Sequence, residues 1–327
     1  MNKPFVSIIV VNWNERDVLG ECLTSLTHLA YPNYEIIVVD NASTDGSPDI
    51  VKEKFPEVKL IINDKNLGFA AGCNAGIKSV KGEMIALFTA DEVVGPSWLN
   101  EIVKSIGNSP NVGIAGGPIL YYEPNNVVWS AGFRIDGITG IDWRIGHGSR
   151  LGQLGKIVDI DYVSGGGLLI KKEVIKKIGL LDEGFFLYCE DADWNLRAKR
   201  VGYRCNFSPF AVIWHKRFYP QKISLQAYYF HARGIFRLYF KHFPLKYLIT
   251  ALFFQLFIVP TFEVLFFRRR ICFVKARIKG FVWNLLRLAE VISERRKSES
   301  LGKLVLKNRL RECLSIAKLS KFSGRIP

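Results

Sequence analysis

Three carboxylates stand close together in "FFLYCEDADW", residues 185–194, directly behind a run of aromatic and aliphatic side chains. Apolar neighbours keep water from a carboxylate and raise its pKa, which suits a general base. The same segment has helix character, and the helix dipole favours acids in a first turn. The dipole accounts for Asp193, whereas helical spacing points Asp191 to a different side. Asp191 is therefore a candidate for proton transfer, with a purely structural role for all three acids as the alternative.

Polar residues follow four apolar runs in the first hundred residues: Asn12, Asp40, Asn63 and Asp91. In an open parallel sheet the ligand crevice lies at the carboxyl ends of the strands. Each residue alone is explained as a loop or helix-capping residue. The four together predict a polar ligand that lies across one edge of a sheet.

The elements that would position these residues alternate between strands and helices. Runs rich in Val and Ile predict strands, buried on both faces, at 5–11, 35–40, 59–63 and 84–89. The segments between them have helical spacing, which predicts an α/β fold with a mostly parallel sheet covered by helices on both sides. A further strand is expected at 156–163 and helices at 171–179 and 190–202.

The section from about 110 to 165 is rich in glycine, and we expect irregular binding loops or a lid there. Gly165, Gly166 and Gly167 follow it. They either let a backbone approach a ligand closely or form a tight bend.

Several protein classes are excluded or disfavoured. The first strand-to-helix turn, "NWNERD", lacks the GxGxxG glycines of dinucleotide-binding proteins, and no GxxxxGK[ST] phosphate loop occurs. This disfavours an NAD-linked oxidoreductase. The six cysteines are widely spaced without a CxxC pair, which fits a reducing compartment rather than a zinc module or a disulfide framework.

Taken in order, the motifs resemble those of family 2 inverting glycosyltransferases with the GT-A fold, in the rhamnosyltransferase-like branch. The matching segments span residues 5 to about 217 and are "VSIIVVNWNE", "YEIIVVDNASTDGS", "NLGFAAGCNAGIK", "VSGGGLLIKKEV", "GLLDEGFFLYCEDADWNLRAKRVGYR" and "AVIWHKR". The resemblance implies an enzyme that moves a sugar, with rhamnose as a candidate, from a nucleoside-diphosphate donor to a hydroxyl of a cell-surface or lipid-linked glycan.

The resemblance also implies roles for individual residues. Asp191 is the general base, with Glu190 beside it in the catalytic pair. The residues expected to bind the nucleotide are Val11, Asn12, Asp40, Asn66, Gly68 and Phe69. Gly165 and Gly166 are expected at the donor and acceptor pocket.

A divalent cation, Mg²⁺ or Mn²⁺, is expected at Asp91 and His215. It would neutralise charge on the leaving diphosphate. The family usually has a DxD-like or NxD-like signature here, whereas this sequence has Thr89-Ala90-Asp91, which leaves one carboxylate. A buried histidine satisfied by backbone is the alternative for His215. Because this signature has only one carboxylate, a second hypothesis is a catalytically weak nucleotide-sugar-binding subunit of a glycan-assembly complex.

The positive charge of the chain is concentrated near its end. Residues 268–327 contain 17 Lys and Arg against 4 Asp and Glu, which is +13 of the total net charge of +15. Just before them, residues 248–267 form a run of apolar side chains long enough to cross a bilayer, weakened by Gln255, Pro260 and Glu263. We therefore expect a catalytic domain at 1–240 and a helical membrane-attachment region at 241–327.

The predicted partner of this second region is an anionic membrane surface, because bases alternate with large apolar residues in 273–292. The donor sugar nucleotide and the basic tail both belong on the cytoplasmic side. A single crossing would separate them, so we expect monotopic or re-entrant attachment at the cytoplasmic face of the membrane. An apolar helix packed on the domain, or a homodimer interface, is the alternative. Nucleic-acid binding is disfavoured, because no recognised reader fold accompanies the basic tail.

Overall fold

The computed structural model describes residues 3–107, 109–154, 160–216, 224–267 and 271–302. Strands and helices alternate through the first ninety residues, as predicted. They are β1 (Val6–Asn12), α1 (Arg16–Thr27), β2 (Tyr34–Asp40), α2 (Ser47–Lys54), β3 (Lys59–Ile62), α3 (Gly68–Ile77) and β4 (Met84–Thr89).

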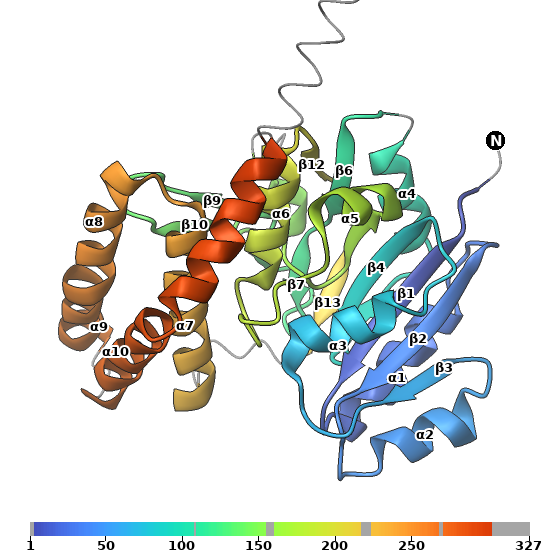
Figure 1. Ribbon diagram of the computed structural model, residues 1–327. Helices are drawn as coiled ribbons and strands as arrows, with labels where there is room; N and C mark the ends of the chain where they lie inside the picture. Colours follow the sequence, from blue (N-terminus) through green and yellow to red (C-terminus); the bar gives the residue numbers. More distant parts are fainter. Residues whose placement is uncertain (1–2, 108, 155–159, 217–223, 268–270, 303–327) are drawn as a thin grey trace, which may run out of the picture.

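A mixed sheet forms the centre of the molecule (Figure 1), with the strand order β12-β6-β11-β4-β1-β2-β3. Its remaining strands are β6 (Val112–Gly116), β11 (Leu168–Lys171) and β12 (Arg204–Phe207). Only β11 runs antiparallel to its neighbours β4 and β6, so the prediction of a mostly parallel sheet is confirmed.

The register brings the carboxyl ends of the central strands to one edge. Asn12 at the end of β1 lies opposite Asp40 at the end of β2. On the other side of β1, Val11 lies opposite Thr89, the last residue of β4. The polar residues that follow these strands therefore meet at the same edge of the sheet.

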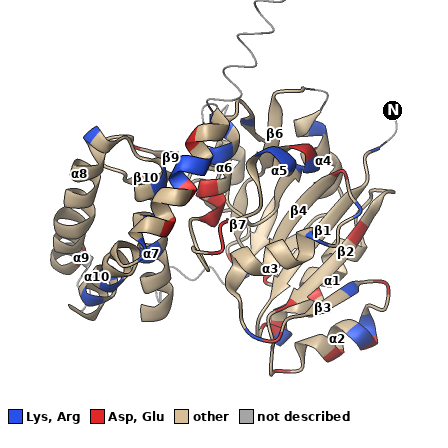
Figure 2. Ribbon diagram, viewed as in Figure 1, with Lys and Arg blue, Asp and Glu red and all other residues tan. Residues whose placement is uncertain are grey.

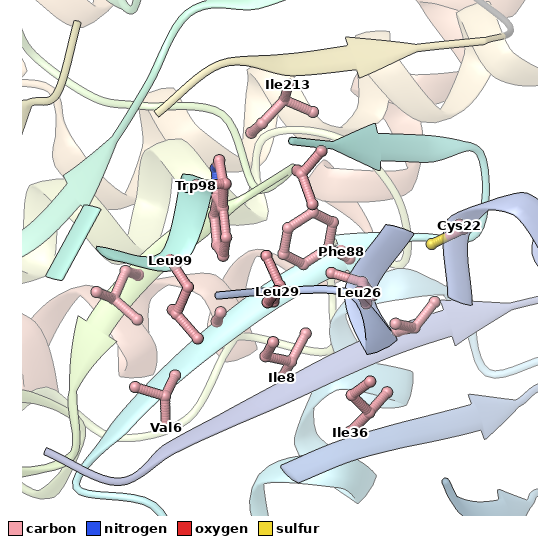
Figure 3. Packing of buried hydrophobic residues seen from close by; sticks show 14 of the residues in the cluster. Val6, Ile8, Cys22, Leu26, Leu29, Ile36, Phe88, Trp98, Leu99 and Ile213 are labelled. Atoms are coloured by element: carbon pink, nitrogen blue, oxygen red, sulfur yellow. The ribbon is translucent and has the colours of Figure 1, made fainter. Parts of the chain in front are cut away.

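Two hydrophobic clusters cover the two faces of the sheet, and Figure 3 shows the one beneath α1 and α4 (Trp98–Ile106). There the ring of Phe88 meets the edge of Trp98 at a centroid distance of 4.9 Å. The other cluster lies beneath α3, α5 (Lys172–Ile178) and α6 (Glu190–Arg200). β1, β2 and β4 are largely buried, as predicted.

The expectation that β3 is buried on both faces is wrong. Lys59 and Ile62 are exposed, because β3 is the edge strand of the sheet and pairs on one side only.

The expectation of irregular loops at 110–165 is also wrong in part. A second sheet has the order β5-β13-β7-β8, formed by β5 (Glu92–Val94), β13 (Ile213–His215), β7 (Ile119–Tyr121) and β8 (Val128–Ser130). β9 (Phe133–Ile135) and β10 (Asp142–Arg144) form an antiparallel hairpin.

The strand predicted at 156–163 falls partly outside the described residues. Within 160–163, only Tyr162 pairs, in an isolated bridge with Phe133. The strand in this region is β11 instead, directly after the three glycines.

Four helices lie to one side of the sheet (Figure 1): α7 (Leu225–His242), α8 (Leu245–Phe253), α9 (Val259–Phe267) and α10 (Ile271–Leu285). A π-helical turn, Phe254–Ile258, joins α8 to α9. α7 packs against α6 and against α10. It continues past residue 240, where the sequence predicts that the catalytic domain ends.

The stretch Leu245–Leu265 is long and apolar enough to cross a membrane by length and composition, and only 17% of its most apolar window is buried. Such a helix is weak support for a span, because core helices of soluble proteins pass the same test. α10, which the sequence predicts to lie at a membrane surface, packs on the protein along one of its faces. Arg277, Gly280 and Asn284 are buried, because α10 packs along α7 through this face.

Candidate active site

The segment before α6 has an unusual backbone. Phe186, Tyr188 and Cys189 have φ angles of 66°, 70° and 69°, in the left-handed region that residues with a Cβ rarely adopt. Each such residue costs about 1–3 kcal/mol and persists only where its surroundings hold it in place. Strained backbone therefore lies immediately before the catalytic pair predicted at Glu190 and Asp191.

Burial separates the three neighbouring carboxylates. Asp193 is fully buried and Glu190 is 4% exposed, whereas Asp191 is partly exposed. Only Asp191 of the three can therefore meet a substrate without a rearrangement of the helix.

Asp193 is committed to an ion-pair network. Its carboxylate lies 2.9 Å from Arg197 Nη2, 2.6 Å from Lys241 Nζ and 2.8 Å from His242 Nε2. The cations Arg197 and Lys241, together with the hydrogen bond to His242, hold the pKa of Asp193 well below its usual range, despite burial. Asp193 therefore joins α6 to α7 and has no oxygen left for chemistry.

Asp191 has the properties expected of a proton acceptor. Burial raises the pKa of Asp191 to about 6, while hydrogen bonds from the N–H groups of Gly165 and Ala192 oppose the increase. The Gly165 N–H donates to Asp191 Oδ2 at 2.8 Å. Burial raises the pKa of Glu190 well above its usual value, with a further contribution from Asp191. The two neighbouring acids therefore disfavour being ionised at the same time.

The predicted nucleotide-binding residues form a continuous polar edge. Asn12 Nδ2 donates to Asp40 Oδ2 at 2.7 Å, and Asp40 Oδ1 accepts from the Ser43 N–H at 2.8 Å. Val11 lies next to them, at the end of β1. These bonds fix the Asp40 carboxylate at the end of β2.

A second group of these residues begins α3. Asn66 Oδ1 accepts from the Gly68 N–H at 2.8 Å. Gly68 has a φ of +80°, and a Cβ there would lie 2.7 Å from the ring of Phe186. Only glycine allows both this backbone conformation and this close approach. Because the Phe69 N–H donates to the Phe186 carbonyl at 2.7 Å, the start of α3 is attached to the strained segment.

Gly165 lies between Phe69 of the predicted nucleotide-binding residues and Asp191, the predicted general base. A Cβ at Gly165 would lie 3.1 Å from the Phe69 ring and 3.6 Å from Asp191 Cβ. The structure therefore brings Phe69, Gly165 and Asp191 together. Gly166 has a packing reason of its own: a side chain there would collide with the buried carboxylate of Glu92. The role of these glycines in a donor or acceptor pocket stays a prediction.

Asp91 and His215, the predicted metal ligands, are also adjacent. Asp91 Oδ2 lies 3.2 Å from His215 Nδ1, because β13 pairs with β5 and sets His215 opposite Glu92. Burial lowers the pKa of His215, which favours the neutral imidazole that a metal requires. One carboxylate and one imidazole suit Mn²⁺ better than Mg²⁺.

No group of three or more His, Cys, Asp or Glu side chains that could hold a metal is found in the part of the chain that the structure describes. The two side chains fit a cation only if it takes its other ligands from diphosphate and water.

Thr89 and Gly234 contact candidate site residues or their neighbours, and the sequence analysis identified neither contact. Thr89 Oγ1 donates to Asp91 Oδ1 at 2.7 Å, so the threonine that replaces the first acid of the family signature orients the second. The backbone of Gly234 in α7 lies against Tyr188 and Cys189. Thr89 could have been found from its place in the signature, whereas nothing in the local sequence points to Gly234.

The carboxyl-edge site and the mixed sheet define a nucleotide-sugar transferase fold of the GT-A class. A mannosyltransferase of Pyrobaculum calidifontis, solved in complex with GDP-Man and Mn²⁺, has this fold with a TM-score of 0.54. It is 16% identical, and the match covers 95% of this chain and 87% of that one.

A family model for glycosyl transferase family 2 matches residues 7–179. The chain belongs to this family, and it is a glycosyltransferase. Glycosyltransferase AglE of Haloferax volcanii is 27% identical over 240 residues, which are 69% of this chain and 74% of that protein. The N-acetylglucosaminyl-diphospho-decaprenol L-rhamnosyltransferase of Mycobacterium tuberculosis is 22% identical over 234 residues, 64% of this chain and 75% of that protein. The chain spans only 24% and 33% of two further relatives. The predictions of the family and of the fold are confirmed.

Proposed function

We propose that this glycosyltransferase inverts the anomeric centre of its donor sugar, with Asp191 as the general base. One observation carries the proposal: the Asp191 carboxylate is partly exposed and has a pKa of about 6. Phe69 of the predicted nucleotide segment lies beside it at Gly165. A base with this pKa is mostly ionised at neutral pH and still accepts a proton readily.

In the proposed reaction, a hydroxyl oxygen of the acceptor attacks the anomeric carbon from the side opposite the diphosphate. The new carbon–oxygen bond forms while the bond to the leaving phosphate oxygen breaks. The nucleoside diphosphate departs with the electron pair, and the anomeric configuration inverts. The hydroxyl proton passes to Asp191, whose orientation is held by the Gly165 N–H.

On the donor side, Asn12 and Asp40 would hold the base of the nucleotide, and Asn66, Gly68 and Phe69 would lie along the diphosphate. Asp91 and His215 would hold a divalent cation. When bound, such a cation neutralises the charge that develops on the leaving diphosphate.

The names of the relatives suggest candidate substrates for this enzyme. One relative is named as a rhamnosyltransferase that acts on a decaprenol-linked sugar, and one structural neighbour was solved with GDP-Man. We propose a cell-surface or lipid-linked glycan as the acceptor. A panel of nucleotide sugars that includes dTDP-rhamnose and GDP-mannose, scored by released nucleoside diphosphate, identifies the donor.

The test of the proposed base is Asp191→Asn. We expect this change to lower kcat by at least about a hundredfold, within the range that general bases contribute, and to leave the dissociation constant for nucleoside diphosphate nearly unchanged. The matched control is Asp161→Asn, which removes a partly exposed carboxylate that pairs with Lys199 of the same helix. Normal turnover by the Asp191 variant would refute the assignment.

The weak-subunit hypothesis is separated by calorimetry together with turnover. Titration of the full chain with UDP, GDP and dTDP, each with and without Mn²⁺, should give heat and a metal effect if the site binds nucleotide. A catalytically weak binding subunit would give this heat but no release of nucleoside diphosphate in the nucleotide-sugar panel.

We also propose that α8 and α9 attach the protein to the cytoplasmic face of a membrane without crossing it. Ile249, Phe257 and Leu265 are 78%, 59% and 68% exposed. On the opposite side, Gln255 and Glu263 contact the buried Arg277 of α10. The polar residues that weaken this stretch as a span thus face the protein, which leaves one apolar face for lipid. Figure 2 shows that α8 and α9 are almost free of charge, while α10 carries several bases.

A further inference from the structure

Helix α7 supports the strained segment, residues 185–189, from the side opposite α3. The Phe186 ring stacks on Phe230 at a centroid distance of 4.6 Å. A Cβ at Gly234 would lie 2.6 Å from the Tyr188 carbonyl oxygen and 3.2 Å from Cys189 Sγ. The backbone of α7 therefore touches the segment directly, and any side chain at position 234 would push it away.

Arg233, the residue before this glycine, is buried at 8% exposure and extends to the same segment. Its Nη2 donates to the Gly184 carbonyl at 2.8 Å. Its guanidinium lies 4.0 Å from the ring centroid of Trp283 in α10 and 5.4 Å from that of Phe230. The Arg233 side chain thus links α10 to the point where the strained segment begins.

α10 fixes Arg233 in this position. Asn284 Nδ2 donates to the Arg233 carbonyl at 2.9 Å. A Cβ at Gly280 would lie 2.8 Å from the Arg233 nitrogen, so the two helices approach each other closely there. A chain of direct contacts therefore runs from α10 through Arg233 and Gly234 to the residue before Glu190.

We propose that Arg233 and Gly234 are positioning residues for Asp191, and that α7 and α10 complete the active site by holding Phe186, Tyr188 and Cys189 in their left-handed conformation. This inference rests on the proposed role of Asp191 as the base. Left-handed residues with a Cβ persist only where surrounding contacts determine them, and α3 and α7 supply those contacts from two sides. If α7 withdraws, the segment relaxes, and the first turn of α6 moves with it.

The experiment uses the full chain and four variants: Arg233→Ala, Arg233→Lys, Gly234→Ala and the control Phe240→Ala. Phe240 packs with Phe236 and Val291 in a different part of the α7 surface, so its loss weakens packing without touching the segment. Hydrogen exchange of the amides of residues 186–192 is measured by mass spectrometry. The same samples give kcat for donor hydrolysis and the dissociation constant for UDP, GDP or dTDP, whichever binds.

We expect Gly234→Ala and Arg233→Ala to speed amide exchange in 186–192 by at least about tenfold. They should lower kcat about a hundredfold, the cost of a misplacement of about 1 Å. Nucleotide affinity should fall by much less than kcat, because Asn12 and Asp40 lie on other elements and only the start of α3 contacts the segment. Arg233→Lys, which keeps a donor for the Gly184 carbonyl, should recover most of kcat.

The inference is overturned if exchange and kcat in the Gly234 and Arg233 variants match those of Phe240→Ala. Should Arg233→Ala fail to fold, the comparison of Arg233→Lys and Gly234→Ala with the control decides. Asp191→Asn separates the two proposals. If that variant is inactive while α7 variants behave like the control, only the positioning role fails; if it keeps full turnover, the proposed function fails.

Discussion

Single residues in the segment 190–193 show how environment assigns different tasks to neighbouring acids. Asp191 and Asp193 differ by two positions in the same helix, yet one has a raised pKa and the other a lowered pKa. Burial raises the pKa of both acids. For Asp191 the hydrogen bonds from two amide groups offset only part of this increase, whereas for Asp193 the cations Arg197 and Lys241, with the hydrogen bond to His242, reverse it.

At this scale we predict a pH dependence of catalysis. Because Asp191 must be deprotonated to accept a proton, kcat/KM should rise with pH through about 6 and then level off. Below that pH it should fall about tenfold per unit. Initial rates between pH 5 and 8 with the wild type and Asp161→Asn check this. A value of kcat/KM that stays constant down to pH 5 would show that the base is not in this environment.

The sequence predicted the direction of the Asp191 pKa from the aromatic run before it. It also separated Asp191 from Asp193 by helical spacing. It could not predict the partners of Asp193, because Lys241 and His242 lie far along the chain. The same holds for Gly234, whose importance follows only from the contact of α7 with Tyr188.

Between elements, the Asp193 network is the main polar connection of α6 with α7. We predict that Asp193→Asn lowers the free energy of unfolding by about 3–5 kcal/mol, because it leaves the buried Arg197 without its carboxylate and Lys241 with Asp182 alone. Urea denaturation at pH 7 measures this loss. Asp161→Asn breaks a partly exposed pair and should cost at most about 1 kcal/mol. Equal losses in the two variants would contradict the prediction.

The contribution of Asp193 to the free energy of unfolding also depends on pH. Since the folded-state pKa of Asp193 lies below its value in the unfolded chain, its contribution is present above about pH 4 and is lost as the pH falls further.

Long elements with clear periodicity were predictable, and the strands β1, β2 and β4 and helix α6 were placed within two residues. The second sheet was not, because its strands are three residues long and β13 pairs with strands about a hundred residues earlier. Strands this short carry no recognisable alternation, so the glycine-rich section looked irregular.

For the whole molecule we predict binding to anionic vesicles through α8 and α9. Ile249→Glu with Phe257→Glu should weaken binding to vesicles containing phosphatidylglycerol by at least about tenfold, because each change removes about 1.5–3 kcal/mol of apolar burial. Co-sedimentation at low and high salt measures this, and salt should weaken the wild-type interaction.

The matched control for the vesicle experiment is Ile62→Glu. Ile62 is also half exposed, at 51%, but lies on β3 at the far edge of the sheet. Equal binding by the double variant and this control would contradict attachment through α8 and α9.

Helix α7 has a practical consequence for how the protein can be prepared. A chain shortened after residue 240 to improve solubility would lack Lys241 and His242 and would lose α10, which packs on Arg233. It would keep every motif of the family and still leave a buried acid without two of its partners. Exchanging outward side chains such as Ile249 for polar ones is the safer route to a well-behaved sample, because it leaves the inner face of every helix intact.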